Sequence, residues 1–140
     1  IASHGLETRV SIMDECSDMP AAYMLSDVVV SPSTDPEGFG RTVGEAQAMG
    51  RPVVASDHGG AREQIIDRRT GFLFPNGDAA ALAGGLRRAL ALAPDARARL
   101  HDDAIHRVRA EFSKDQMCAR TLGVYREVLR AGARSQASRT

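Results

Sequence analysis

The stretch DVVVSPSTDPEGFGRTVGEAQAMGRPVVAS, residues 27–56, decides the fold of this chain. It opens and closes on short β-branched runs without polar alternation, at 27–31 and 52–56, which are typical of parallel strands covered on both faces. Between them, residues 42–49 carry a helical pattern that stops at Gly50 and Pro52, because glycine and proline end helices. A strand, a helix and a strand in this order predict a βαβ unit with a right-handed crossover and a parallel sheet.

The segments outside this stretch extend the alternation of strands and helices. Before it, residues 9–13 have the composition of a short strand, and residues 20–26 that of a helix whose N-terminus Asp18 can cap. After it, we expect a short helix at 61–65 and a last strand at 71–74. The expected fold class is therefore α/β, a Rossmann-like parallel sheet flanked by helices.

From Asp78 onward the sequence becomes helical, with apolar residues three or four positions apart that we expect to pack against the core. These stripes are Leu82, Leu86 and Leu90, then Leu100, Ala104 and Val108, then Met117, Thr121, Val124 and Val128. We assign residues 1–132 to one domain and expect the polar segment 133–140 to be a disordered tail. Because the chain opens at Ile1 without an initiator methionine, we also expect the opening β-α unit of the sheet to be missing.

Length, charge and cysteine content limit the function classes. The 140 residues suit a single core, and 18 basic residues balance 18 acidic ones, so the field that draws a protein to nucleic acid is absent. No apolar run approaches the roughly 20 residues of a membrane-spanning helix. Cys16 and Cys118 lack the close spacing of zinc or redox pairs. We therefore expect a cytoplasmic protein with free thiols and no nucleic-acid partner.

Two loops, at 31–42 and 57–60, follow the two buried strands. Ligands of open parallel sheets bind at the carboxyl ends of the strands, so both loops should line one site. Gly38 and Gly40 lack Cβ atoms just before a helix, which opens the helical N–H groups to a phosphate, and Arg41 adds a positive charge. The same glycines also fit a plain tight turn. A dinucleotide fingerprint would need a further glycine three positions later, so an NAD enzyme is not expected.

Two carboxylates flank the expected phosphate position. Glu37 precedes the glycines and Glu45 lies one turn into the helix, and carboxylates accept the paired hydrogen bonds that sugar hydroxyls donate. Each has an alternative role, because Glu45 can complete a capping box that begins at Thr42 and Glu37 can be a solvated loop carboxylate. His58 is interpreted as a lone loop histidine. The two histidines within 101–106 lie on different helix faces, so no metal site is expected.

Taken together, these residues resemble the C-terminal domain of the family 4 glycosyltransferases, which are retaining enzymes of the GT-B fold. The segments that carry the resemblance are YMLSDVVVSPS (23–33), EGFG (37–40), EAQAMG (45–50), PVVA (52–55), GG (59–60) and TGFLF (70–74). The spacing of Glu37 and Glu45, with seven residues between them, is the most specific element in this context. The resemblance covers roughly residues 8–130. Residues 13–16 depart from the family pattern and receive no role.

The resemblance implies a role for each part of the motif. Glu37 would be the catalytic residue beside the reacting carbon of the transferred sugar, to which residues 39–40 would offer backbone N–H groups. Residues 42–43 would bind the diphosphate and Glu45 the ribose hydroxyls. The family's basic Arg and Lys pair would precede Ile1. The substrate-binding residues implied for the nucleotide sugar are Glu37, Gly38, Phe39, Gly40, Arg41, Thr42, Val43 and Glu45.

The implied function is retaining transfer of a sugar from a nucleoside diphosphate sugar to an acceptor, without a cofactor or metal, in bacterial cell-surface polysaccharide or lipopolysaccharide biosynthesis. A glycan or lipid-linked acceptor would be bound mainly by a missing N-terminal domain, which would also bring the protein to the inner face of the plasma membrane. This chain alone would then be inactive. The alternatives are a non-catalytic nucleotide-sugar binding module and a structural interaction domain in which Glu37 and Glu45 are replaceable.

Overall fold

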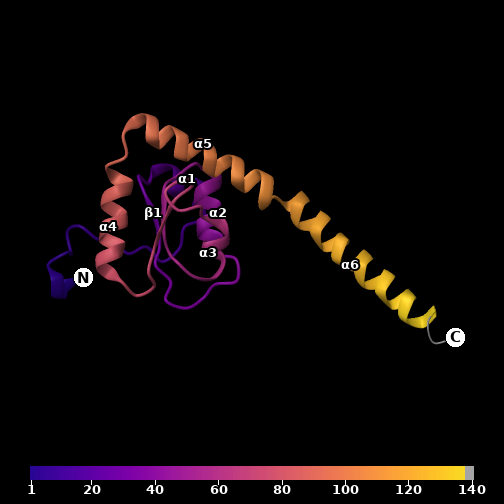
Figure 1. Ribbon diagram of the computed structural model, residues 1–140. Helices are drawn as coiled ribbons and strands as arrows, with labels where there is room; N and C mark the ends of the chain where they lie inside the picture. Colours follow the sequence, from indigo (N-terminus) through magenta and orange to yellow (C-terminus); the bar gives the residue numbers. More distant parts are fainter. Residues whose placement is uncertain (138–140) are drawn as a thin grey trace.

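The sheet is parallel, as the sequence predicts. The computed structural model describes residues 1–137, and for 133–137 the path of the backbone alone. The strands β1 (Val29–Ser31), β2 (Val53–Ser56) and β3 (Phe72–Phe74) pair in the order β1-β2-β3, with β2 hydrogen-bonded to both neighbours. Figure 1 shows these strands between α4 on one side and α2 with α3 on the other.

The helices lie close to where the sequence patterns predict them. They are η1 (Ala2–His4, a 3-10 turn), α1 (Met19–Leu25), α2 (Arg41–Ala48), α3 (Gly59–Gln64), α4 (Ala79–Leu90), α5 (Pro94–Glu111) and α6 (Lys114–Ala137). Asp18 caps α1 as expected, because its carboxylate accepts a hydrogen bond from the Ala21 N–H at 3.0 Å. Asp78 caps α4 in the same way through the Ala81 N–H at 2.8 Å.

Two apolar clusters cover the two faces of β2. Successive side chains of a strand point to opposite faces, so Val53 and Ala55 face one cluster and Val54 faces the other. The first cluster also contains Tyr23, Val43, Ala46 and Ile65, and the second Phe72, Phe74, Ala89 and Leu100. Because β2 is buried along its whole length, the loops at its carboxyl end start from a rigid support.

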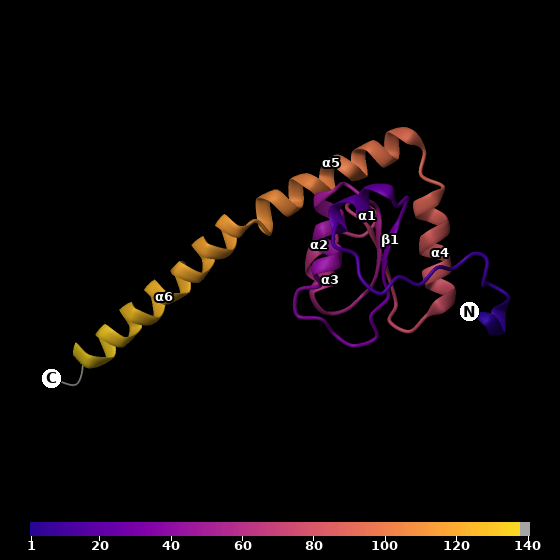
Figure 2. The same ribbon diagram turned by 180° about the vertical axis from the view of Figure 1, so that it is seen from behind.

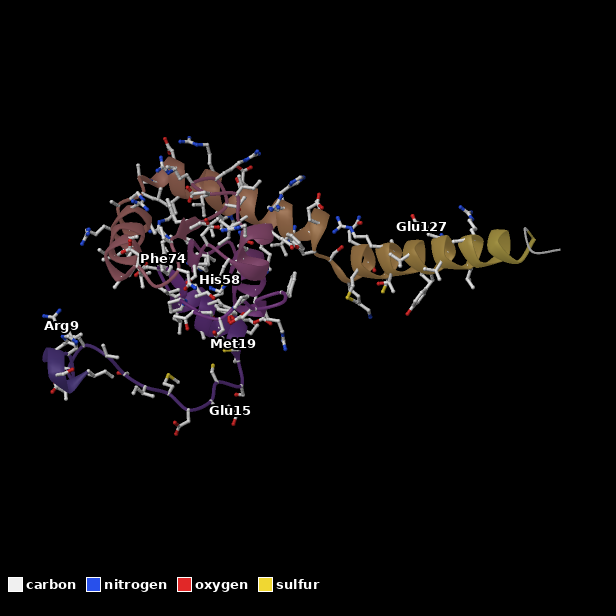
Figure 3. All side chains as sticks on the ribbon, turned by 60° about the horizontal axis from the view of Figure 1, so that its bottom comes forward. Arg9, Glu15, Met19, His58, Phe74 and Glu127 are labelled. Atoms are coloured by element: carbon white, nitrogen blue, oxygen red, sulfur yellow. The ribbon has the colours of Figure 1, made fainter. Side chains whose placement is uncertain are left out.

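The strand expected at residues 9–13 is absent, which corrects the prediction. This segment is irregular, and Ile12 and Met13 are 79% and 76% exposed. A strand is stable only when its N–H and C=O groups pair with a neighbour, and no described strand pairs with this segment. Figure 3 shows the part of the chain that carries Arg9 and Glu15 looping away from the sheet.

The apolar stripes pack only as far as α5. Leu82 and Leu86 contact the second cluster and Leu100 and Ala104 are buried, as predicted, whereas Leu90, which we expected to pack with them, is exposed. The stripe on α6 does not pack, because this helix projects beyond the sheet in Figure 2. Its apolar residues Met117, Leu122, Val124, Tyr125, Val128 and Leu129 are all exposed.

The C-terminal end of the last helix also differs from the prediction. α6 continues past residue 132 to Ala137, into the segment 133–140 that the sequence assigned to a disordered tail, and residues 138–140 lie outside the described part of the chain. Among the helices within residues 1–137, none combines the length and apolar content needed to cross a bilayer.

A buried polar contact fixes the turn that leads into β3. Thr70 is 1% exposed, and its hydroxyl accepts hydrogen bonds from the Ile66 N–H at 2.9 Å and from the Gln47 amide at 3.2 Å. The same amide donates to the Thr70 carbonyl at 2.9 Å. The contact joins α2 to the segment between α3 and β3.

We expect Thr70→Val to destabilise the fold by about 1–3 kcal/mol, because the substitution keeps the shape but removes the acceptor of the part-buried Ile66 N–H and one acceptor of the buried Gln47 amide. Urea unfolding followed by circular dichroism measures this loss. Thr121→Val on α6 is the matched control, since its hydroxyl is exposed and donates only to the Met117 carbonyl. Equal effects of the two substitutions would contradict a specific role of the Thr70 contact.

Candidate functional site

The loops that follow β1 and β2 meet at the carboxyl edge of the sheet. The Gly60 N–H donates to the Glu37 carbonyl at 2.9 Å, and the His58 Nε2 lies 2.7 Å from the Ser33 carbonyl oxygen. Asn76, after β3, donates its side-chain amide to the Thr34 carbonyl at 2.8 Å. The loops therefore form one surface, as the parallel topology predicted.

Two glycines allow the close approach of these loops. A Cβ atom on Gly60 would lie 2.3 Å from the Phe39 carbonyl oxygen, and one on Gly59 would lie 2.6 Å from the Glu37 carbonyl oxygen. Gly59 also has φ 54°, which side chains disfavour. The residues 37–39 therefore rest on the first turn of α3 because residues 59–60 have no side chains.

We expect Gly60→Ala to lower the free energy of unfolding by about 1–3 kcal/mol, since its methyl group meets backbone atoms that cannot turn away. Chemical denaturation measures this change. Gly38→Ala is the control, because a Cβ at Gly38 would have no atom within 4 Å. Similar stability of the Gly60→Ala and wild-type proteins would show that residues 37–39 do not need this contact.

The first turn of α2 is electropositive. Its N-cap is Gly40, with φ 75° and ψ 71°, and the turn contains no acidic residue. The unpaired N–H groups of a helix N-terminus carry about half a positive charge, and Arg41 lies in the same turn. The side-chain amide of Gln64 donates a hydrogen bond to the Phe39 carbonyl, just before this turn. This arrangement suits an anion such as a phosphate.

Glu37 is exposed, but a neighbour constrains its carboxylate. The Ser33 hydroxyl donates to Glu37 Oε1 at 2.7 Å, a short hydrogen bond to a charged acceptor. Gly38 is exposed as well, and Phe39 is 47% exposed with its ring centroid 5.7 Å from that of Phe112. Glu37 is thus more ordered than a freely solvated loop carboxylate.

Glu45 does not act as a helix cap, so the capping-box alternative is wrong. α2 begins at Arg41, and the Glu45 side chain points to other partners. Its carboxylate accepts a hydrogen bond from the Tyr23 hydroxyl at 3.0 Å and forms an ion pair with Arg41 at 2.9 Å. Its side chain is 38% exposed, so its carboxylate remains accessible from solvent.

The other predicted residues of α2 differ in accessibility. Thr42 is exposed, whereas the Val43 side chain is fully buried in the first apolar cluster. Only the backbone of Val43 could reach a ligand, and its N–H donates to the Gly40 carbonyl at 3.1 Å. Gly44 makes room for its neighbours, because a Cβ there would lie 2.9 Å from the Gln64 side-chain oxygen.

The Arg41 guanidinium can leave the Glu45 carboxylate at a small cost in free energy. Its side chain is 86% exposed, and exposed pairs four residues apart in a helix contribute about 0.3–0.5 kcal/mol. The pair also has its cation on the N-terminal side, which is the less favourable order for the helix dipole. An anion at the N-terminus of α2 would therefore compete well with Glu45 for the Arg41 guanidinium.

Burial raises the pKa of the Tyr23 phenol, and the hydrogen bond and negative charge of Glu45 raise it further. The Thr42 hydroxyl and Arg41 act in the opposite direction. The neutral phenol is the form that can donate to the carboxylate. Tyr23 therefore orients Glu45 from within the first apolar cluster.

We expect Glu45→Gln to lower the pKa of Tyr23, because the substitution removes the charge that disfavours the phenolate. Burial, which is the largest cause of the raised pKa, is unaffected by the substitution, so only part of the upward shift should be lost. Phenolate absorbance against pH, in a Tyr125→Phe background that leaves one titrating phenol, measures the shift. An unchanged midpoint would mean that the Tyr23–Glu45 contact does not exist in solution.

Sequence reasoning missed three residues of this site. Tyr23, Ser33 and Gln64 each contact a predicted site residue, but they lie 22, 4 and 25 positions away from it along the chain. His58 is also more than a lone loop histidine, since it contacts the loop after β1. Over residues 1–137, no group of three or more His, Cys, Asp or Glu side chains has the geometry of a metal site.

Comparison with known proteins identifies the family of this chain. The family described as glycosyl transferases group 1 matches residues 1–91, which include the whole sheet and both loops. This chain belongs to the group 1 glycosyltransferases. The similarity of its fold to solved glycosyltransferases of the GT-B class confirms the fold that the resemblance implied.

Individual group 1 glycosyltransferases are similar over most of this chain. The lipopolysaccharide core biosynthesis mannosyltransferase LpcC of Rhizobium leguminosarum bv. viciae is 34% identical over 132 residues, which cover 92% of this chain and 36% of LpcC. The crystal structure of a glycosyltransferase from Rickettsia africae ESF-5 has a TM-score of 0.85 and 36% identity, over 91% of this chain and 34% of that one.

A third similar protein was crystallised with a ligand. Anabaena HepE, solved in complex with UDP-glucose, has a TM-score of 0.79 and 32% identity, over 88% of this chain and 34% of HepE. The chain thus spans about a quarter to a third of the length of the relatives it matches.

Proposed function

We propose that this chain is the donor-binding domain of a retaining glycosyltransferase, which transfers a sugar from a nucleoside diphosphate sugar to an acceptor. The observation that carries the proposal is that Glu37 precedes the electropositive first turn of α2 and Glu45 follows it along the chain. A nucleotide sugar offers the matching order of groups, with sugar hydroxyls, a diphosphate and ribose hydroxyls in sequence. Membership of the group 1 glycosyltransferases supports this assignment.

The diphosphate would lie at the N-terminus of α2. There the backbone N–H groups of Arg41 and Thr42 precede the first intrahelical bonds, and the Arg41 guanidinium can turn toward a phosphate oxygen. On one side, Glu45 would accept hydrogen bonds from the ribose hydroxyls. On the other, Glu37 would bind hydroxyls of the transferred sugar, beside the backbone of Gly38, Phe39 and Gly40.

The reaction breaks the bond between the anomeric carbon and the diphosphate oxygen, and its electron pair leaves with the diphosphate. Preorganised N–H donors and Arg41 would stabilise the developing negative charge, so that the transfer proceeds without a metal or cofactor. The anomeric carbon becomes positively charged, as in glycoside hydrolysis, and the Glu37 carboxylate would stabilise it. The acceptor hydroxyl then forms the new bond on the face that the diphosphate leaves, with retention of configuration, and its proton passes to the departing diphosphate oxygen.

Other parts of the whole protein would complete the function. Relatives are longer than this chain, so we assign the glycan or lipid-linked acceptor mainly to residues outside it. The similarity to a mannosyltransferase of lipopolysaccharide core biosynthesis supports a place in bacterial cell-surface polysaccharide or lipopolysaccharide assembly. We accordingly place the protein in the cytoplasm, at the inner face of the plasma membrane.

Calorimetric titration of the chain with UDP, GDP, ADP and their sugars tests the proposal. UDP and UDP-glucose come first, because Anabaena HepE was solved with UDP-glucose. We expect one nucleotide to bind and Glu45→Ala to weaken it at least about tenfold, because hydrogen bonds to a charged acceptor contribute about 1.5–3 kcal/mol each. Glu127→Ala on α6, labelled in Figure 3, is the matched control for loss of an exposed carboxylate.

The outcomes separate the alternatives. Binding that Glu45→Ala leaves unchanged would remove the ribose role of Glu45. Failure of the chain to bind any of the six ligands would contradict a donor-binding domain. Binding without sugar transfer by the full-length protein would indicate a non-catalytic nucleotide-sugar binding module instead.

A further inference from the structure

We propose that His58 is a positioning residue that orients the Glu37 carboxylate through Ser33. This inference rests on the proposed function in one respect, namely that Glu37 faces the transferred sugar. His58 itself does not contact Glu37. It acts on the neighbour that donates a hydrogen bond to the carboxylate.

The first contact joins the two loops. His58 follows β2 and precedes α3, and its Nε2 lies 2.7 Å from the Ser33 carbonyl oxygen. A carbonyl oxygen accepts hydrogen bonds only, so the Nε2 atom carries the proton and donates it. The contact thus selects one tautomer of the imidazole and fixes the backbone of Ser33 relative to β2.

The second contact reaches the carboxylate. The hydroxyl of the same Ser33 donates to Glu37 Oε1 at 2.7 Å. A hydroxyl can rotate, but the direction of its oxygen depends on the backbone from which it projects. With the Ser33 carbonyl bound to His58, that backbone has one orientation, and the exposed Glu37 carboxylate receives its hydrogen bond from a fixed direction.

The surroundings of His58 do not suggest that its main role is to stabilise the fold. His58 and Ser56 line a small pocket of about 10 Å³ together with Ser33 and Glu37. Within the described part of the chain, the His58 Nδ1 and Ser56 Oγ atoms are buried without a hydrogen-bond partner. Leaving such groups unpaired costs about 1–3 kcal/mol, and these exceptions call for an explanation other than packing.

Other contacts secure the loop independently of His58. Asn76 binds the Thr34 carbonyl, Gly60 binds the Glu37 carbonyl, and Gln64 binds the Phe39 carbonyl. Loss of the imidazole should therefore leave the path of the loop after β1 intact and free only the Ser33 carbonyl from its hydrogen bond. This separates a positioning role from a general structural one.

The test compares binding of a nucleoside diphosphate with binding of its nucleotide sugar, using UDP with UDP-glucose, GDP with GDP-mannose or ADP with ADP-glucose, whichever pair the wild-type chain binds. We expect His58→Ala to weaken binding of the nucleotide sugar about tenfold, while binding of the nucleoside diphosphate stays unchanged. His58→Gln should recover most of the loss, because its amide can donate near the position of Nε2. His106→Ala, an exposed histidine on α5, is the matched control.

A double substitution checks the coupling to the carboxylate. If His58 acts through Glu37, His58→Ala should add little to the loss caused by Glu37→Ala, since the group that it orients is already gone. An equal loss of affinity for both ligands in His58→Ala, or no loss for either, would overturn the proposal. So would full additivity of the two substitutions.

Nuclear magnetic resonance without any ligand provides a second readout. The nitrogen shifts of the neutral His58 ring should report a proton on Nε2, and a proton on Nδ1 would overturn the proposal. The carboxyl carbon shift of Glu37 should move in His58→Ala and return in His58→Gln. If the wild-type chain binds none of the nucleotides, the proposed function fails, and this carboxyl shift alone then supports or overturns the positioning role.

Discussion

The close approach of residues 37–39 to the first turn of α3 is the constraint on which the site depends. The Gly60 N–H binds the Glu37 carbonyl, and any side chain at Gly60 would overlap the backbone of Phe39. This contact brings the loop after β1 against the loop after β2. Without it, Glu37, the N-terminus of α2 and His58 would not share one surface.

The rest of the site follows from the helix that starts above this contact. α2 begins at Arg41, after the N-cap Gly40, and its first turn contains no acidic residue, so the positive end of the helix dipole is not neutralised within that turn. The carboxylate of Glu45 lies one turn later, where Tyr23 orients it from the core. The groups that we propose to bind the phosphate and the ribose hydroxyls therefore lie on successive turns of one helix.

Burial explains why the support of this site is rigid although its surface is open. β2 is buried along its length and both apolar clusters meet on it, so the positions at its carboxyl end have little freedom to move. The Gln64 side chain is also fully buried, and its amide donates a hydrogen bond to the Phe39 carbonyl. Glu37, Gly38 and Thr42, which we propose to face the ligand, are exposed, and each is close in sequence to a buried residue.

The sequence by itself determined the βαβ order, the two loops and the candidates Glu37 and Glu45, because these depend on local composition and spacing. Only the tertiary structure decided that residues 9–13 form no strand, since a strand requires a partner that local sequence cannot reveal. It also excluded the capping role of Glu45, whose partner Tyr23 lies 22 residues away along the chain. The contacts of His58 with Ser33 and of Gln64 with Phe39 likewise join segments that are adjacent only after folding, so no local pattern encodes them.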